Sequence, residues 1–234
     1  MMVSSMKINK QAILEKLASM YPHMESALVY HNPFELLVST ILAAQCTDAR
    51  VNMVTPALFR DYPDAFAMAK AEPEEIYPYV KSCGFSAKAK NIVLASRKIV
   101  SDHAGNVPSD MESLVALPGV GRKTANVVRA FAFQIPAIPV DTHVLRVSNR
   151  LGLASALTPE ETEKQLMDVI PEKDWCDAHH WILYHGRRVC HSQKPDCANC
   201  ELKQLCLAAN TRMINPKLDA RKKKKEAPHD SPAL

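Results

Sequence analysis

The sequence predicts an all-α fold. Apolar residues recur along most of the chain at the i, i+3, i+4 spacing of amphipathic helices. Only six of the 234 residues are glycine, and the alternation of β-branched and polar residues that marks strands is nearly absent. These patterns favour helices joined by short turns over any architecture built on a sheet.

Capping residues mark several of the expected helix starts. Asn32 precedes Pro33, and Glu35 stands at the third helical position, which is the order of an N-cap, a first-turn proline and an acidic N3 residue. The stretches 109–112 and 158–161 repeat this capping-box logic. We therefore expect helices over residues 8–20, 33–46, 48–60, 73–80, 86–102, 110–116, 122–132, 141–151, 159–169 and 174–189.

Two segments of the chain do not fit a helical pattern. The stretch from Gln134 to Asp141 carries Pro136 and Pro139, so it predicts a stiff connector and a candidate domain junction. Residues 213–234 contain a lysine run and end in small, polar and proline residues, which predicts a disordered basic tail.

The composition excludes several classes of protein. With 47% hydrophobic and 23% charged residues, the chain as a whole is not intrinsically disordered. The longest weakly polar run, 130–140, is interrupted by prolines and falls far short of the roughly 20 residues of a membrane span. Residues 1–11 lack the apolar core of a signal peptide, so we expect a reducing, cytosolic compartment.

The charge distribution says more than the net charge of +4. The run Arg221–Lys225 carries five of the 29 basic residues, so the rest of the chain is close to neutral. Basic residues concentrate in 80–100, where there is no acidic residue, and in 117–150, where Asp141 is the one acid. Such segments fit the footprint of a polyanion, although solvated helix faces explain them equally well.

Four of the seven cysteines form a compact group, Cys190-x6-Cys197-x2-Cys200-x5-Cys206. A reducing compartment disfavours disulfides, and the close spacing disfavours scattered free thiols, so the group predicts a metal centre. Zinc and an iron–sulfur cluster both accept four thiolates; the single C-x2-C pair slightly favours iron–sulfur. The remaining cysteines are expected to be small buried apolar residues: Cys46, Cys83 and Cys176.

The segment from Leu117 to Thr124 has a glycine on each side of Val120 and resembles the turn of a helix-hairpin-helix motif. Glycines allow a close approach to phosphate, and free N–H groups at the following helix start favour an anion. An ordinary interhelical turn is the alternative. Lys123 lies in the first turn of that helix, where the dipole disfavours a cation, so its amine is a candidate Schiff-base nucleophile as well as a surface lysine.

Asp141 follows the proline-rich connector in Val140-Asp141-Thr142-His143. There it can cap the next helix, and a capping carboxylate can point its second oxygen into a cleft. Paired with Lys123 across a groove, it could stabilise positive charge developing on a sugar or help transfer protons. Helix capping alone is the alternative.

Together, the hairpin with Lys123, the segment 140–143 and the four-cysteine spacing resemble the bacterial endonuclease III family of DNA glycosylases and apurinic/apyrimidinic lyases. The resemblance covers about 8–210 and includes Leu42–Asp48 and His180–Arg187. It implies a helix-hairpin-helix glycosylase fold with a barrel over 26–135, the hairpin motif at about 109–131, and a cluster domain of 1–25 plus 136–212.

The same resemblance implies the site residues. Lys123 is the nucleophile and Asp141 the assisting carboxylate, while the four cysteines hold a [4Fe-4S] cluster. Gln45 fills the space left by an extruded nucleotide. The loop 84–88 is one residue shorter than the family's wedge loop, and Phe85 is its apolar candidate. The DNA contacts implied beside these two are Leu117, Gly119, Val120, Gly121, Arg122 and His143.

The resemblance implies removal of oxidised pyrimidines from double-stranded DNA, followed by β-elimination at the abasic site through a lysine Schiff base. The expected partner is DNA bearing such a lesion, with no membrane association, and a monomer acting in the cytoplasm at the bacterial nucleoid. Two alternatives remain: a monofunctional glycosylase of the adenine branch, and a non-catalytic DNA-binding module with zinc. Lys123 and the short tail after Cys206 argue against the adenine branch.

Overall fold

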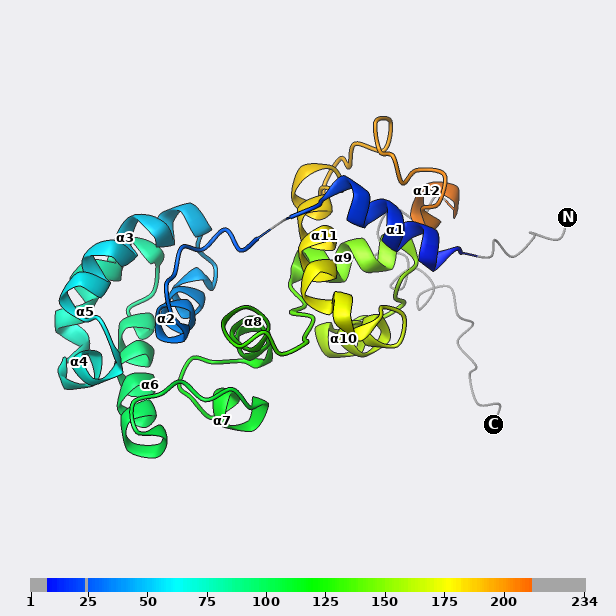
Figure 1. Cartoon of the computed structure of the whole chain (residues 1–234). Coiled ribbons are helices and arrows are strands. Elements are labelled where there is room, and N and C mark those ends of the chain that lie inside the picture. The colour runs from blue at the N-terminus through cyan, green and yellow to red at the C-terminus, as the bar shows by residue number, and fades with distance from the viewer. Residues whose placement is uncertain (1–7, 24, 212–234) are drawn as a thin grey trace, which may run out of the picture. The chain divides into compact units, whose positions relative to one another are not determined.

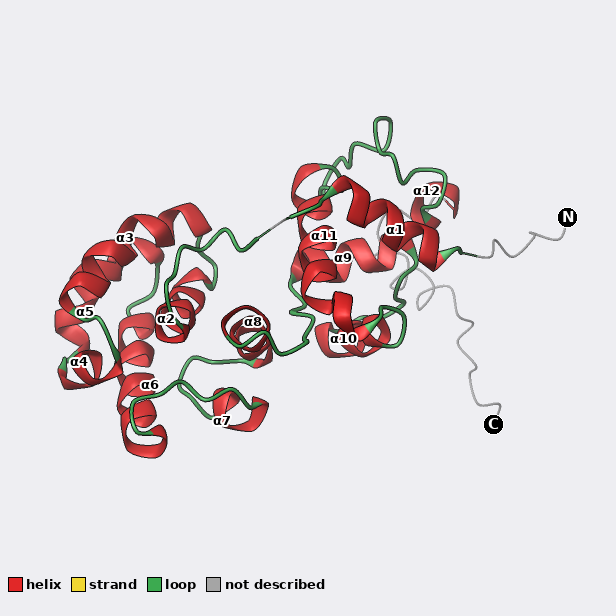
Figure 2. Cartoon of the chain, in the orientation of Figure 1, coloured by secondary structure: helices red, strands yellow, loops and turns green. Residues whose placement is uncertain are grey.

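The computed structural model describes residues 8–23 and 25–211, and within these ranges every regular element is a helix (Figure 2). The all-α prediction is confirmed. The predicted disordered tail, 213–234, lies outside the described residues. None of the helices in the described ranges is both long enough and apolar enough to cross a membrane.

The chain divides into two compact units, Glu25–Pro139 and Met1–Met24 with Val140–Leu234. The elements of both are labelled in Figure 1. The sequence-based assignment of 26–135 to a barrel and of 1–25 plus 136–212 to a cluster domain stays a prediction.

In the unit 25–139, a buried helix forms the centre. Phe34 and every residue from Leu36 to Leu42 are buried in α2, which packs against α3, α6 and α8. Helix α6 in turn packs on α4 and α5, and α7 packs on α8. The elements of this unit are α2 (Pro33–Ala43), α3 (Asp48–Asp61), α4 (Ala65–Lys70), α5 (Pro73–Val80), η1 (Lys81–Cys83), α6 (Ala87–His103), α7 (Met111–Val115) and α8 (Arg122–Ala132).

In the other unit, α9 is the helix that most others contact. It packs on α10, α11 and α12, and α1 packs on α11. The segment 189–206, which carries all four clustered cysteines, runs between α11 and α12 without a regular helix. The elements are α1 (Lys10–Met20), α9 (Thr142–Leu151), α10 (Pro159–Met167), η2 (Glu172–Asp174), α11 (Trp175–Arg188) and α12 (Leu207–Thr211).

The observed helices differ from the expected ones at short elements and at one helix end. Helices α4 and α12 are missing from the expected set, because six and five residues are too few to display a helical period and neither has the capping-box pattern that marks the equally short α7. Helix α2 ends at Ala43 and not at residue 46, because Ala44 already leaves the helical conformation with ψ of 112° and Gln45 is left-handed with φ of 57°.

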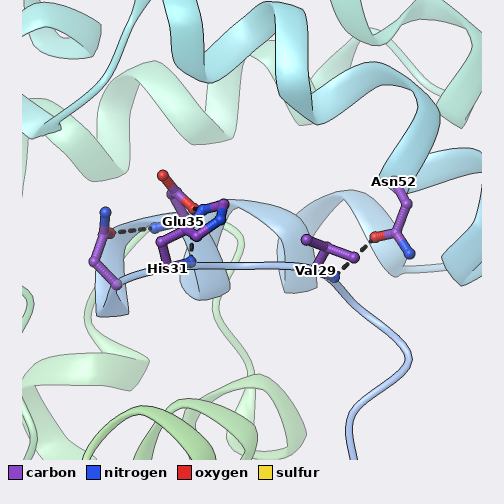
Figure 3. A network of polar contacts seen from close by, with 5 residues as sticks. Val29, His31, Glu35 and Asn52 are labelled. Atoms are coloured by element: carbon purple, nitrogen blue, oxygen red, sulfur yellow. Dashed lines mark hydrogen bonds and ion pairs between the residues drawn. The ribbon is translucent and has the colours of Figure 1, made fainter.

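The N-terminus of α2 is fixed by a network of side chains (Figure 3). Glu35 N donates to Asn32 Oδ1 at 2.9 Å, and His31 N donates to Glu35 Oε2 at 2.8 Å. Just upstream, Val29 N donates to Asn52 Oδ1 at 3.0 Å, which ties the entry of α2 to α3. The expected cap at Asn32 is therefore confirmed.

Removing this cap is expected to destabilise the chain. Asn32→Ala deletes the acceptor of Glu35 N and should lower the free energy of unfolding by about 1 kcal/mol, while Asn32→Asp, which keeps a capping oxygen, should lower it much less. Urea unfolding of both variants measures this. An equal loss in the two variants would contradict a capping role.

Candidate active site and cysteine cluster

The hairpin turn before α8 is built on a glycine that no other residue can replace easily. Gly119 has φ of 79°, and a Cβ placed on it would lie 2.9 Å from Asn91 Cβ on α6. Val120 N donates to Leu117 O at 3.1 Å and closes the turn. The side chains of Leu117 and Val120 are buried, so only their main chains can face a ligand.

Helix α8 begins at Arg122 and has Gly121 as its N-cap, so no side-chain cap bond forms there. A helix start of this kind offers main-chain N–H groups and the positive end of the helix dipole to an anion. Lys123, the second residue of α8, is exposed, as are Gly121 and Arg122. The turn and the lysine thus lie together on one accessible helix start.

Asp141 is the N-cap of α9, and the capping part of its expected role is confirmed. Its Oδ1 accepts from His143 N and from Val144 N, both at 2.8 Å. The second carboxylate oxygen, Oδ2, takes no part in this capping. Lys123 belongs to the unit 25–139 and Asp141 to the other unit, so their pairing across a groove stays a prediction.

A short chain of polar contacts links the start of α9 to the first cysteine. Arg146 Nη2 lies 3.1 Å from His143 Nδ1, and the same group donates to Cys190 O at 3.0 Å. It also donates to Gly186 O at 3.0 Å on α11. Burial lowers the pKa of Arg146 from its ordinary value. Helix α9 therefore fixes both Asp141 and the main chain at Cys190.

A second arginine, one turn further along α9, holds the start of the cysteine segment. Arg150 is buried and donates to His191 O at 2.6 Å, to Ser192 O at 3.0 Å and to Cys190 Sγ at 3.4 Å. Sequence reasoning missed both arginines. Their i, i+4 spacing on one helix face was the available signal.

The four cysteines line one pocket, together with Leu151 and His185 among others. Cys190, Cys200 and Cys206 are half-buried and Cys197 is exposed. Burial raises the pKa of the Cys200 and Cys206 thiols. Of the remaining cysteines, Cys83 is buried as expected, whereas Cys46 and Cys176 are half-buried.

The thiols of the four cysteines do not converge on one point in this structure. Across 8–23 and 25–211, no three His, Cys, Asp or Glu side chains gather closely enough to hold one metal ion. A structural zinc needs four ligands at about 2.0–2.3 Å from one point. Four thiols on one pocket are a ligand set that both a zinc ion and a four-thiolate iron–sulfur cluster accept.

The histidines of α11 are buried. His185 is linked to α1 through Tyr21, whose hydroxyl lies 3.1 Å from His185 Nδ1, and its Nε2 lies 3.7 Å from Cys200 Sγ. His179 and His180 stack edge-on, with ring centroids 5.1 Å apart. Burial lowers the pKa of His180 to about 4. This environment is typical of packed, structural histidines.

Two candidate DNA-inserting residues lie at irregular points of the unit 25–139. Gln45 is exposed in its left-handed conformation, directly after α2. Phe85 is 71% exposed and follows Gly84, whose φ is 112°. An exposed aromatic side chain on a turn is unusual for a core residue and suits a wedge.

One basic residue of the segment 80–100 does not belong to a surface footprint. Lys88 is buried, and its ammonium group points to main-chain carbonyls within the unit. The prediction that the basic residues of 80–100 form part of a polyanion footprint is therefore wrong for Lys88. Two of the three carbonyls that it contacts, Leu42 O and Ala44 O, are more than 40 residues away in sequence, so no local pattern reveals the burial.

The chain resembles proteins of known activity over most of its length. The HhH-GPD superfamily base excision DNA repair protein family matches residues 38–172. Endonuclease III of Synechocystis is 52% identical over 209 residues, which cover 88% of this chain and 95% of the relative. Endonuclease III of Bacillus subtilis is 50% identical over 198 residues, which cover 82% of this chain and 89% of the relative. A trapped endonuclease III–DNA covalent intermediate has a TM-score of 0.83 at 43% identity, covering 88% of this chain and 100% of that chain.

The buried state of His180 predicts a pH dependence of stability. The folded chain holds this imidazole neutral, with a pKa of about 4, while the unfolded chain protonates it below about 6.5. Protons therefore favour the unfolded state, and stability falls as pH drops from about 6.5 to about 4, by up to about 3 kcal/mol from this residue.

His180→Gln should flatten that part of the stability profile, measured by urea unfolding at several pH values. His23→Gln is the matched control, because the His23 side chain is exposed. An unchanged slope in His180→Gln would show that this imidazole is not the proton-linked group.

Proposed function

Because the chain belongs to the HhH-GPD superfamily of base excision DNA repair proteins, and within it to the endonuclease III family, we propose that it excises oxidised pyrimidines from duplex DNA and then cleaves the strand at the abasic site. The observation that carries the proposal is the exposed Lys123 in the first turn of α8, directly after the glycine turn. The adenine-glycosylase and non-catalytic alternatives are not favoured.

The first step is extrusion of the damaged nucleotide, because the glycosidic carbon is shielded inside stacked DNA. Gln45 fills the vacated space and Phe85 wedges between neighbouring bases. The turn at Gly119 and Gly121, with the N–H groups at the start of α8, binds a backbone phosphate and sets the register without reading sequence. Arg122 and His143 add further backbone contacts.

Lys123 then acts as the nucleophile. Its neutral amine forms a bond from Nζ to C1′ as the C1′–N glycosidic bond breaks, and the departing base takes up a proton. The sugar ring opens to give an imine. Loss of a C2′ proton is followed by cleavage of the 3′ carbon–oxygen bond, and the phosphate leaves. Water finally hydrolyses the imine and restores the lysine.

Asp141 serves this reaction from the start of α9. Its Oδ1 is engaged by the main chain of α9, so we assign to Oδ2 the stabilisation of positive charge developing on the sugar. Because capping fixes the χ angles of the side chain, the carboxylate is held in one orientation before substrate binds. The pairing with Lys123 is part of this proposal.

We further assign a [4Fe-4S] cluster to Cys190, Cys197, Cys200 and Cys206, supported by the pocket that the four residues share and by their spacing in the sequence. When bound, the cluster supplies a rigid anchor for the segment 189–206. Lys194 and Lys203 in that segment are then available to the DNA backbone. We expect a monomer that acts on DNA in the cytoplasm, as its relatives are bacterial repair enzymes.

Borohydride trapping tests the nucleophile. Wild type incubated with a duplex carrying an abasic site or thymine glycol should give a covalent protein–DNA band, because borohydride reduces the imine to a stable amine. Lys123→Gln should abolish the band, and Lys70→Gln, an exposed lysine of α4, should retain it. Absence of a band from folded, metal-loaded wild type would remove the lyase assignment.

Metal analysis tests the cluster. Purified wild type should contain about four iron atoms per chain and the corresponding sulfide, with visible absorbance. Cys206→Ser should lose most of the iron, because a thiolate ligand is gone, whereas Cys176→Ser lies outside the group and should not. Stoichiometric zinc in wild type would contradict the cluster.

A further inference from the structure

The Lys88 ammonium group is almost fully enclosed in the unit 25–139. The residue is 8% exposed, and Nζ donates to Leu42 O at 2.8 Å, to Ala44 O at 2.5 Å and to Cys83 O at 2.6 Å. Lysine is rarely buried, since its charge is strongly hydrated. Here three carbonyls match the three N–H donors that an ammonium group has.

These carbonyls belong to two segments of chain. Leu42 and Ala44 lie at the C-terminal end of α2, where carbonyls lack helical partners and the helix dipole is negative. Cys83 ends η1. One positive charge therefore joins the end of α2 to the end of η1, and charge-assisted hydrogen bonds of this kind are stronger than neutral ones.

The residues that follow each segment need such support. Gln45 comes directly after Ala44 and is left-handed, with φ of 57°. Gly84 comes directly after Cys83, with φ of 112° and ψ of −137°, a conformation open essentially to glycine alone. Burial raises the pKa of the Cys83 thiol, and the Cys46 thiol lies close enough to raise it further, so the two segments meet at a second point.

We propose that Lys88 is a positioning residue that holds Gln45 and Phe85 in the conformations needed to enter the duplex. The inference rests on the proposed function, in which both residues occupy space opened by base extrusion. Lys88 itself touches neither DNA nor the sugar, because its N–H donors are directed to the main chain. It acts through the backbone at Ala44 and Cys83.

The position of the inserted side chains determines how strongly the rate depends on them. A side chain that replaces an extruded nucleotide must lie where that nucleotide was, and a misplacement of about 1 Å can lower a rate by about a hundredfold. Without the three hydrogen bonds of Lys88, the left-handed turn at Gln45 and the turn at Gly84 lose their common anchor. Lys123 on α8 keeps its own turn, which Gly119 and Asn91 define.

The test separates DNA insertion from lysine chemistry. Lys88→Met keeps an unbranched side chain of similar length without the donors, and Lys70→Met is the control for loss of a surface positive charge. In Lys88→Met, amide hydrogen exchange should rise in peptides covering 42–47 and 83–86 and stay unchanged in 117–132. Removal of thymine glycol from duplex DNA should fall by roughly tenfold to a hundredfold.

Borohydride trapping on single-stranded DNA with a ready-made abasic site needs no gap to be filled, so it should stay within about twofold of wild type. On a Gln45→Ala, Phe85→Ala background, Lys88→Met should cost little more, because the two residues it positions are already gone. Should Lys88→Met fail to fold, Lys88→Arg carries the same measurements, as a planar guanidinium cannot reproduce the three-way contact.

Three results would overturn the inference: unchanged exchange at 42–47 and 83–86, equal losses on the duplex and single-stranded substrates, or an additive loss on the Gln45→Ala, Phe85→Ala background. Failure of the proposed function looks different, because wild type itself would then neither release the base nor form the trapped adduct. In that case, amide hydrogen exchange in 42–47 and 83–86 still tests whether Lys88 holds the two segments.

Discussion

The burial of α2 is the constraint from which the rest of the unit 25–139 follows. This helix packs against α3, α6 and α8, so its axis fixes the place of the helix that bears Lys123. Its N-terminus is capped by Asn32, and its last carbonyls accept from Lys88. Because both ends are tied by specific polar contacts, the exposed Gln45 beyond its C-terminus starts from a defined point. Apolar burial and the polar contacts at both ends thus hold α2 in place and define where the segment with Gln45 begins.

Helices α8 and α9 use the main-chain N–H groups at their N-termini in opposite ways. Helix α8 has glycine at its N-cap, so no side chain competes for the N–H groups that an anion can bind. Helix α9 has Asp141 there, and Oδ1 satisfies two of its N–H groups internally. The glycine N-cap of α8 suits phosphate binding. The Asp141 N-cap of α9 holds a carboxylate in one orientation, which suits a catalytic role. On the same α9, Arg146 donates to Cys190 O and Arg150 to His191 O, so the carboxylate and the cysteine segment share one rigid element.

The sequence predicted the long helices and the cap at Asn32 correctly, because capping and helical periodicity are local signals. It also grouped the four cysteines that line the shared pocket. It did not reveal the burial of Lys88, whose partners include carbonyls more than 40 residues away, nor the early end of α2 at Ala43. The spacing of Arg146 and Arg150 indicates a shared helix face but not their partners, which depend on the path of the chain after α11. Contacts between distant segments, and the backbone conformations they stabilise, lie outside what local patterns encode.

The central claim is that one amine, at the start of α8, forms the covalent bond to the sugar. Protease digestion of the borohydride-reduced adduct followed by mass spectrometry tests it most directly. The account predicts that the sugar mass lies on a peptide beginning at Lys123 and running to Arg129, because trypsin cleaves after Arg122 but not after a modified lysine. Finding the sugar on the N-terminal amine or on another lysine would contradict it, and would return Lys123 to the role of a phosphate contact.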